Sequence, residues 1–132
     1  MPTNAAVPLI AWSRAFSGTP AQVREARRFL STIVAGREAA DDAVLCLSEL
    51  VTNATLHSYS GRPGSQFTVR VEMNGNSFRI EVHDEGGSWH GAGAPGELHG
   101  RGLSIVSRLA RDWGRDGDSE IGWTVWCELD CR

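Results

Sequence analysis

Two segments of alternating polarity, separated by a tight-turn sequence, most constrain the fold of this chain. Apolar and polar residues alternate over residues 67–73 and again over residues 78–82. Half-buried strands show this period of two, because successive side chains point to opposite faces. The residues between them are Asn74-Gly75-Asn76, and an Asn-Gly pair is strongly preferred in tight hairpin turns. The sequence therefore predicts an antiparallel β-hairpin that ends at Asp84.

Helical periodicity is found on both sides of this hairpin. Residues 20–35 carry apolar residues at helical spacing, with Thr19 placed as an N-cap and Gly36 at the expected C-terminal glycine position. Residues 37–58 show a longer apolar stripe without any glycine or proline, which predicts the longest helix of the chain. A third helix is predicted over residues 102–110.

Two more strands complete the predicted elements. Residues 7–16 and 121–129 are rich in β-formers, and a short strand or turn is expected at residues 113–114. Strands and helices in this proportion predict an α+β fold, a two-layer α/β sandwich whose mixed, mainly antiparallel sheet carries helices on one face. At 132 residues the whole chain, 1–132, is expected to form a single domain.

The composition argues against several classes of protein. A net charge of -3, with all 13 basic residues being Arg, leaves no surplus for binding a nucleic-acid backbone. The three cysteines form no CxxC pair, which argues against a zinc ribbon and a disulfide framework and favours a reducing compartment. No segment approaches the roughly 18 apolar residues of a membrane span. We therefore expect a cytoplasmic protein without membrane or direct nucleic-acid partners.

Polar residues in the longest predicted helix form the first candidate site. Glu49, Asn53 and His57 are spaced by four, so their side chains lie in one row beside the apolar stripe. Such a row is also found on ordinary solvated helix faces. A row at the border of a buried face predicts the wall of a pocket.

Two glycine-bearing segments form the rest of the candidate site. Asp84 closes an apolar strand and is followed by Gly86 and Gly87, which let the backbone approach a flat ring or simply turn. Residues 85–100 are rich in glycine and are interpreted as a mobile lid. At the start of the third helix, free N–H groups and the helix dipole favour phosphate over the run Gly100-Arg101-Gly102-Leu103.

The order of the motifs along the chain carries more information than each motif alone. That order is Glu49-Leu-Val-Thr-Asn53-Ala, then Asp84-Glu-Gly86-Gly87, then Gly100-Arg-Gly102-Leu. In this combination the sequence resembles the GHKL ATPase superfamily with its Bergerat-type ATP-binding fold, and more narrowly the anti-sigma-factor serine/threonine kinases of actinobacterial type. The resemblance covers nearly the whole chain. The stretch Gly86-Gly87-Ser-Trp departs from the Gly-x-Gly that is usual in the better-known kinases.

The resemblance implies a role for each motif residue. Asn53 is expected to coordinate the Mg²⁺ that bridges the phosphates, Asp84 to bind the adenine amino group, and Glu49 to act as the general base. Thr124 is expected to support the adenine-binding carboxylate. The residues of the two glycine-bearing segments that are expected to contact ATP are Gly86, Gly87, Gly100, Arg101, Gly102 and Leu103. The resemblance assigns no role to His90 and His99.

The function implied by the resemblance is that of an anti-sigma factor with serine-protein kinase activity. Such a protein binds a sigma factor and phosphorylates a serine of a STAS-type anti-anti-sigma factor, which regulates transcription by partner switching. The uncovered face of the sheet is expected to support a homodimer. One alternative is a non-catalytic ATP-binding anti-sigma or adaptor protein. Another is the ATP-binding domain of a sensor histidine kinase, which would need a separate phospho-accepting partner.

Overall fold

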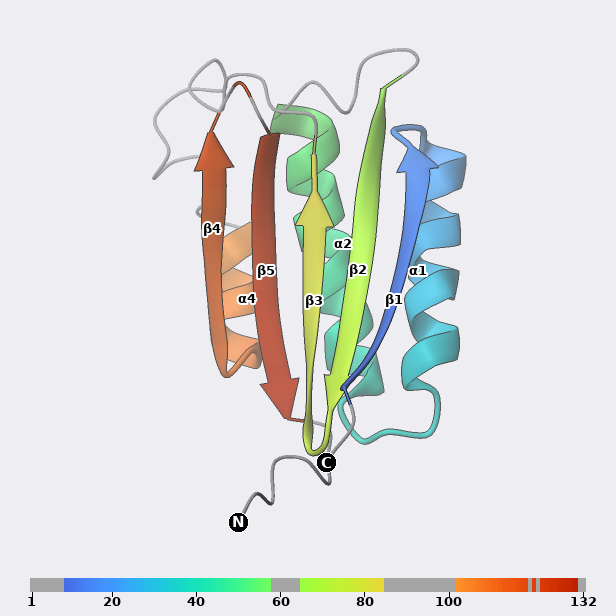
Figure 1. The fold of residues 1–132 in the computed structure, drawn as a ribbon, viewed down its shortest axis with the longest axis vertical. Coiled ribbons are helices and arrows are strands. Elements are labelled where there is room, and N and C mark those ends of the chain that lie inside the picture. Colours follow the sequence, from blue (N-terminus) through green and yellow to red (C-terminus); the bar gives the residue numbers. More distant parts are fainter. Residues whose placement is uncertain (1–8, 58–64, 85–101, 119, 121, 131–132) are drawn as a thin grey trace.

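A computed structural model describes residues 9–57, 65–84, 102–118, 120 and 122–130. The secondary-structure elements in these ranges are shown in Figure 1. They are, in chain order, β1 (Leu9–Ser17), α1 (Pro20–Val34), α2 (Ala40–His57), β2 (Gln66–Asn74), β3 (Ser77–His83), α4 (Gly102–Leu109), β4 (Asp112–Asp118) and β5 (Gly122–Asp130).

The strands form one sheet with the order β1-β2-β3-β5-β4. Every pairing between neighbouring described strands is antiparallel, so the sheet that we expected to be mixed and mainly antiparallel is antiparallel throughout this part of the chain. In Figure 1, helices α1, α2 and α4 lie on the same face of the sheet. The predicted α+β two-layer architecture is confirmed.

The hairpin of β2 and β3 follows the predicted pattern. The two strands pair from Asn74 opposite Ser77 to Thr68 opposite His83. Gly75 turns the chain with a φ of +63°, a left-handed conformation that glycine adopts without steric cost. The alternating apolar residues of both strands are buried against the helices. The period of two in the sequence therefore identified the buried face of the sheet.

The first helix also has the predicted ends. The Thr19 side chain accepts a hydrogen bond from the backbone N–H of Gln22 at 3.3 Å, and Gly36 has a φ of +84°. The second helix begins at Ala40, later than the predicted residue 37. The chain first makes a turn, in which the N–H of Arg37 donates to the carbonyl of Val34 and the N–H of Ala40 to that of Arg37. The apolar pattern predicted this helix but could not separate its first turn from the preceding connection.

The sequence underestimated β4. Instead of a short strand or turn at residues 113–114, the chain forms a seven-residue strand, Asp112–Asp118. This sequence has no apolar alternation, and the strand pairs with β5 along its whole length as the edge of the sheet. Its backbone pairing with β5 therefore places it in the sheet without an alternating pattern in its sequence.

The core lies between the sheet and α2. This helix contacts α1, α4 and strand β3, which makes it the central element of the helical layer. The largest fully buried side chains come from both layers and include Phe16, Leu30, Leu47, Leu50, Phe67, Phe78 and Ile80. Within the described ranges, no helix has the length and apolar character needed to cross a membrane. Packing on both sides of α2 fixes the position of the polar residues that it carries.

Candidate nucleotide site

Several element ends meet at one end of the molecule. In Figure 1, α2 and β3 both end at the upper edge, β5 begins there, and the N-terminal end of α4 faces the same way. Asn53 lies in the last turns of α2, Asp84 directly follows β3, and Gly102 is the first residue of α4. The topology therefore brings residues from three separate predicted motifs to the same end of the sheet.

Asn53 is a buried polar residue with an unusual environment. Its side chain is only 4% exposed, although the neighbouring Thr52 on the same helix is exposed. Within the described part of the chain, the buried Nδ2 atom has no hydrogen-bond partner. Buried amide groups are normally paired, because leaving a donor unpaired costs about 1–3 kcal/mol. Such an exception is typical of a functional site, where a ligand completes the environment.

Asp84 is also buried, and the main chain of the neighbouring strand holds it. Its backbone N–H donates to the carbonyl of Trp123 at 2.9 Å, and its Oδ1 atom accepts from the N–H of Trp123 at 3.0 Å. These two bonds extend the pairing of β3 and β5 by one step. Because side chains alternate along a strand, Asp84 lies on the same side as the buried Val82. The carboxylate is thus held in one orientation on the helical side of the sheet.

Glu49 lies one helical turn before Asn53 on α2, and the two residues share a row of the helix surface. Glu49 is half-buried, whereas its neighbour Leu50 is fully buried in the core. A carboxylate in this position borders the core and remains accessible to another molecule. The predicted third member of the row, His57, is the last residue of α2, and its side chain lies outside the described residues.

Thr124, which we expected to support the adenine-binding carboxylate, contacts His83 in the structure. Thr124 pairs with His83 in the sheet, and its Oγ1 atom lies 2.8 Å from His83 Nδ1. Both side chains belong to the face of the sheet opposite to Asp84, because residues 83 and 84 alternate along the chain. The support for the Asp84 carboxylate comes instead from the backbone N–H of Trp123. A backbone donor leaves no signal in the residue types, so the sequence could not reveal it.

The uncovered face of the sheet carries a polar network that sequence reasoning missed. His83 Nε2 lies 2.9 Å from Glu81 Oε1, and Arg79 donates to Glu81 Oε2 at 2.6 Å and to Glu128 at 3.1 Å. The Arg79 guanidinium also lies over the ring of Trp126, 4.1 Å from its centroid. The polar residues that alternate with the apolar residues of β3 were the sequence signal for this network. We used the alternation only to identify the buried residues.

This network lowers the pKa of Glu81. Burial alone raises the pKa of the Glu81 carboxyl, but the hydrogen bonds from Arg79 and His83 outweigh burial and hold the pKa below its ordinary value. A group with a lowered pKa in the folded state stabilises the fold above its unfolded-state pKa. This contribution is lost as the pH falls through the folded-state pKa.

We therefore expect Glu81→Gln to reduce the dependence of stability on pH in the acid range. The free energy of unfolding of the parent protein should fall more steeply than that of the variant below about pH 4.3, the ordinary glutamate range. Urea denaturation at a series of pH values measures both curves. Glu38→Gln, at an exposed glutamate outside this network, is the control and should follow the parent. Parallel curves for parent and Glu81→Gln would contradict the proposed linkage.

The remaining predicted site residues are described only in part. Gly86, Gly87, Gly100 and Arg101, the lid at residues 85–100, and His90 and His99 lie outside the described residues. Gly102 begins α4, and Leu103 follows it in the helix, although its side chain is not described. The first N–H groups of a helix such as α4 have no partner within the helix, and together with the positive end of the helix dipole they are suitable for phosphate.

The donor set fits a magnesium ion held jointly with phosphates. Among the described residues there is no group of three or more His, Cys, Asp or Glu side chains that could hold a metal by itself. Mg²⁺ commonly takes one or two protein oxygens and completes its shell with phosphate oxygens and water. The carboxamide oxygen of Asn53 has the chemistry of such a ligand, and the Asn53 side chain is almost fully buried.

Comparison with known proteins agrees with this geometry. A family model described as "histidine kinase-like ATPase domain" matches residues 16–126, which include Glu49, Asn53 and Asp84. A search of curated proteins found no match. The matched segment extends from the end of β1 into β5 and therefore includes all of β2, β3 and β4. The chain belongs to the family of histidine kinase-like ATPase domains, whose members bind ATP.

Proposed function

We propose that this protein is an anti-sigma factor that uses ATP and Mg²⁺ to phosphorylate a serine of a STAS-type anti-anti-sigma factor. The observation that carries the proposal is that Asn53 and Glu49 lie one turn apart on α2. Asn53 is buried with an unpartnered amide among the described residues, and one turn away Glu49 keeps a half-buried carboxylate. Binding ATP requires only the first of these features, whereas transfer to a protein hydroxyl also requires a base.

The chemistry assigned to this chain is a single transfer step. The serine oxygen of the substrate protein forms a bond to the γ-phosphorus, while the bond from that phosphorus to the β–γ bridging oxygen breaks and ADP leaves. Glu49 accepts the proton of the serine hydroxyl. When bound, Mg²⁺ neutralises charge on the phosphate oxygens, and Asn53 is the residue that would hold it. Positioning and charge neutralisation supply most of the catalysis in reactions of this class.

Asp84 has the role of recognising the purine. A carboxylate oxygen accepts a hydrogen bond from the exocyclic amine of adenine, and the second oxygen is oriented by the backbone of Trp123. Because the Trp123 bonds fix the carboxylate before ATP binds, little conformational entropy is lost in recognition. This arrangement supports selection of adenine over purines that present a carbonyl at the same position.

We expect Asp84→Asn to lower the affinity for ATP by about tenfold, the effect of losing one good hydrogen bond. The Asn side chain retains an oxygen to accept from Trp123, so the fold should remain intact. Its amide now donates where adenine also donates, and the preference for ATP over inosine triphosphate should fall or reverse. Calorimetric titration with both nucleotides measures this ratio. An unchanged ratio would show that Asp84 does not contact the purine.

The proposed partners follow from the resemblance of the motifs to anti-sigma-factor kinases. A sigma factor and its antagonist compete for this protein, and phosphorylation of the antagonist determines which one is held. The non-catalytic alternative retains ATP binding and the sigma factor but omits the transfer step. The half-buried Glu49 carboxylate favours the catalytic form, because nucleotide binding alone does not need a base in this position.

The test is a transfer assay with the purified chain, labelled ATP, Mg²⁺ and the STAS-type protein encoded nearest to it. The expected result is an acid-stable phosphoserine on the antagonist, with ADP released in equal amount. A substrate in which the target serine is replaced by alanine is the matched control. Binding of ATP and of a sigma factor without phosphate transfer would support the non-catalytic alternative and contradict the proposed kinase activity.

A further inference from the structure

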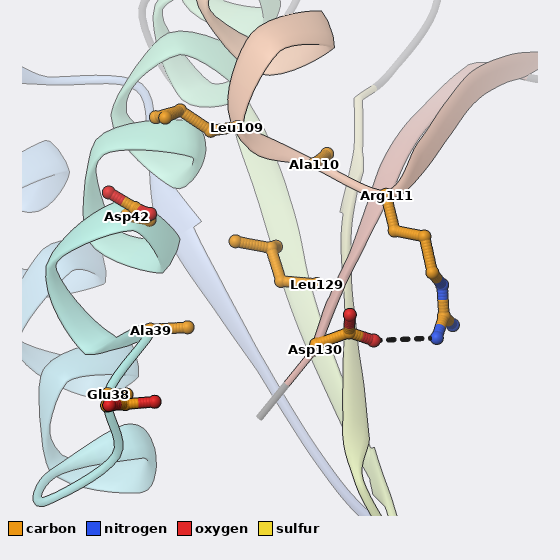
Figure 2. Close-up of a pocket in the computed structure, with 8 residues that line it drawn as sticks. All are labelled: Glu38, Ala39, Asp42, Leu109, Ala110, Arg111, Leu129 and Asp130. Carbon is orange, nitrogen blue, oxygen red and sulfur yellow. Dashed lines mark hydrogen bonds and ion pairs between the residues drawn. The ribbon is translucent and has the colours of Figure 1, made fainter. Parts of the chain in front are cut away.

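A groove lies at the end of the molecule opposite to the nucleotide site (Figure 2). It has a volume of about 610 Å³ and lies between the start of α2, the end of α4 and the end of β5. Its floor is apolar and consists of Ala39, Leu109, Ala110 and Leu129. Figure 2 shows the Leu129 side chain directed from the strand toward α2. None of these residues belongs to the proposed ATP site.

The rim of this groove is acidic. Glu38 and Asp42 line the α2 side, and Arg111 and Asp130 line the sheet side. The Arg111 guanidinium is already engaged, since it contacts Asp130 at 2.8 Å and Glu128 at 3.3 Å. In the described ranges, no ion pair involves Glu38 or Asp42, and both are exposed. Among the described residues, these two carboxylates therefore border the apolar floor without an ion-pair partner.

The apolar surface continues beyond the groove. A shallower depression of about 240 Å³ is lined by Leu45, Ile105, Arg108 and Leu109, so Leu109 belongs to both hollows. Leu45 is 44% exposed, which is high for a large apolar residue on a helix. Leu45 also follows Asp42 by three positions on α2 and lies on the same side of the helix. The surface is thus an apolar strip with carboxylates at one end, and Arg108 also lines it.

We propose that this strip, defined by Asp42, Leu45, Ile105 and Leu109, binds an amphipathic helical segment of a partner protein that carries apolar residues flanked by Lys or Arg. Apolar side chains at helical spacing cover Leu45, Ile105 and Leu109, and the cationic side chains reach Asp42 and Glu38. Helices bind in grooves by this combination of a few apolar anchors with complementary charges at the rim.

Charge complementarity selects this occupant from the other possibilities. Anionic membranes and nucleic acids are repelled by the Asp42 and Glu38 carboxylates, whereas a cationic peptide is attracted. The proposal does not depend on the chemistry of the nucleotide site, because that site is at the other end of α2. Failure of one proposal therefore leaves the other intact.

The experiment uses a fluorescent peptide of about 14 residues with leucines at positions i, i+3 and i+7 and arginines beside them. A second peptide has glutamate in place of each arginine. Fluorescence anisotropy with the full chain should show saturable binding of the arginine peptide and no binding of the glutamate peptide. Asp42→Arg should weaken it at least about tenfold, because a favourable charge contact becomes repulsive. Asp41→Arg is the matched control, since Asp41 is also exposed in the first turn of α2 but does not line the groove.

The outcomes separate the possible occupants. Weaker binding by both Asp42→Arg and Leu45→Ser, with Asp41→Arg and ATP affinity unchanged, supports the proposal. Equal binding of the two peptides, or equal effects of Asp41→Arg and Asp42→Arg, would overturn it.

Sedimentation that shows a self-associated parent and a monomeric Asp42→Arg variant would identify a second copy of this chain as the occupant. Peptide binding that occurs only after removal of residues 1–8 would identify that segment as the occupant, and both results would also overturn the proposal.

Discussion

Replacing Glu49 with glutamine is expected to lower the rate of phosphate transfer to the antagonist serine by about a hundredfold to ten-thousandfold. Glutamine keeps the size of the side chain but cannot accept a proton, so the loss should appear in kcat. The affinity for ATP should stay within about threefold of the parent, because the proposed base acts on the substrate hydroxyl and not on the nucleotide. Quenched-flow assays at saturating antagonist measure the rate, and calorimetry measures the affinity.

The control for this variant is Asp41→Asn, which removes a carboxylate from the same helix at an exposed position in its first turn. It should transfer phosphate at the parent rate. If Glu49→Gln transfers phosphate as fast as the parent, Glu49 is not the base. If it loses rate and ATP affinity together, Glu49 contributes to nucleotide binding instead, and the kinase mechanism needs a different proton acceptor.

The fold could be predicted where one periodicity described a whole element. The β2–β3 hairpin satisfies the alternating pattern along its length and has glycine at the one turn position with a positive φ. The α1 helix has both its N-cap and its terminal glycine in the sequence. Strand β4 fails this criterion, because an edge strand can be held by backbone hydrogen bonds that any sequence can make.

The positions of the candidate residues on their helix and strand could be predicted, but their hydrogen-bond partners could not. Glu49 and Asn53 were placed in one row by the helical period, and α2 extends over both of them. Asp84 was placed at a strand end by the end of the alternation. Its orientation depends on the main chain of Trp123, a residue 39 positions away. The register of β3 against β5 decides that contact, and this register also turns Thr124 toward His83.

The geometry of the chain supports ATP binding more directly than it supports a particular reaction or partner. The matched family model identifies an ATPase domain, and function depends on the particular site more than on the fold. The proposed base at position 49 and the proposed docking strip at the far end of α2 depend on individual residues. Variants at single positions are therefore the direct test of whether this domain is a protein kinase and which surface its partners contact.

Asn53→Ala is expected to abolish the contribution of magnesium to ATP binding. The affinity for ATP in the presence of Mg²⁺ should fall about tenfold to a hundredfold, since loss of a group that supports a metal site typically costs this much. The same substitution removes a buried Nδ2 atom that has no partner among the described residues. The free energy of unfolding without nucleotide should therefore stay within about 1 kcal/mol of the parent.

This combination of a large functional loss with a small change in stability distinguishes a ligand-binding residue from a structural one. Thr52→Ala is the control, because Thr52 is exposed at the preceding position of α2 and its side chain donates to the carbonyl of Ser48 at 2.8 Å. Calorimetric titration with ATP, with and without Mg²⁺, and urea denaturation measure the two effects separately. A strongly destabilised Asn53→Ala would show that the buried carboxamide maintains the fold. If Asn53→Ala binds ATP as tightly as the parent does, Asn53 is not part of the nucleotide site. The observation on which nucleotide binding by α2 depends would then be lost.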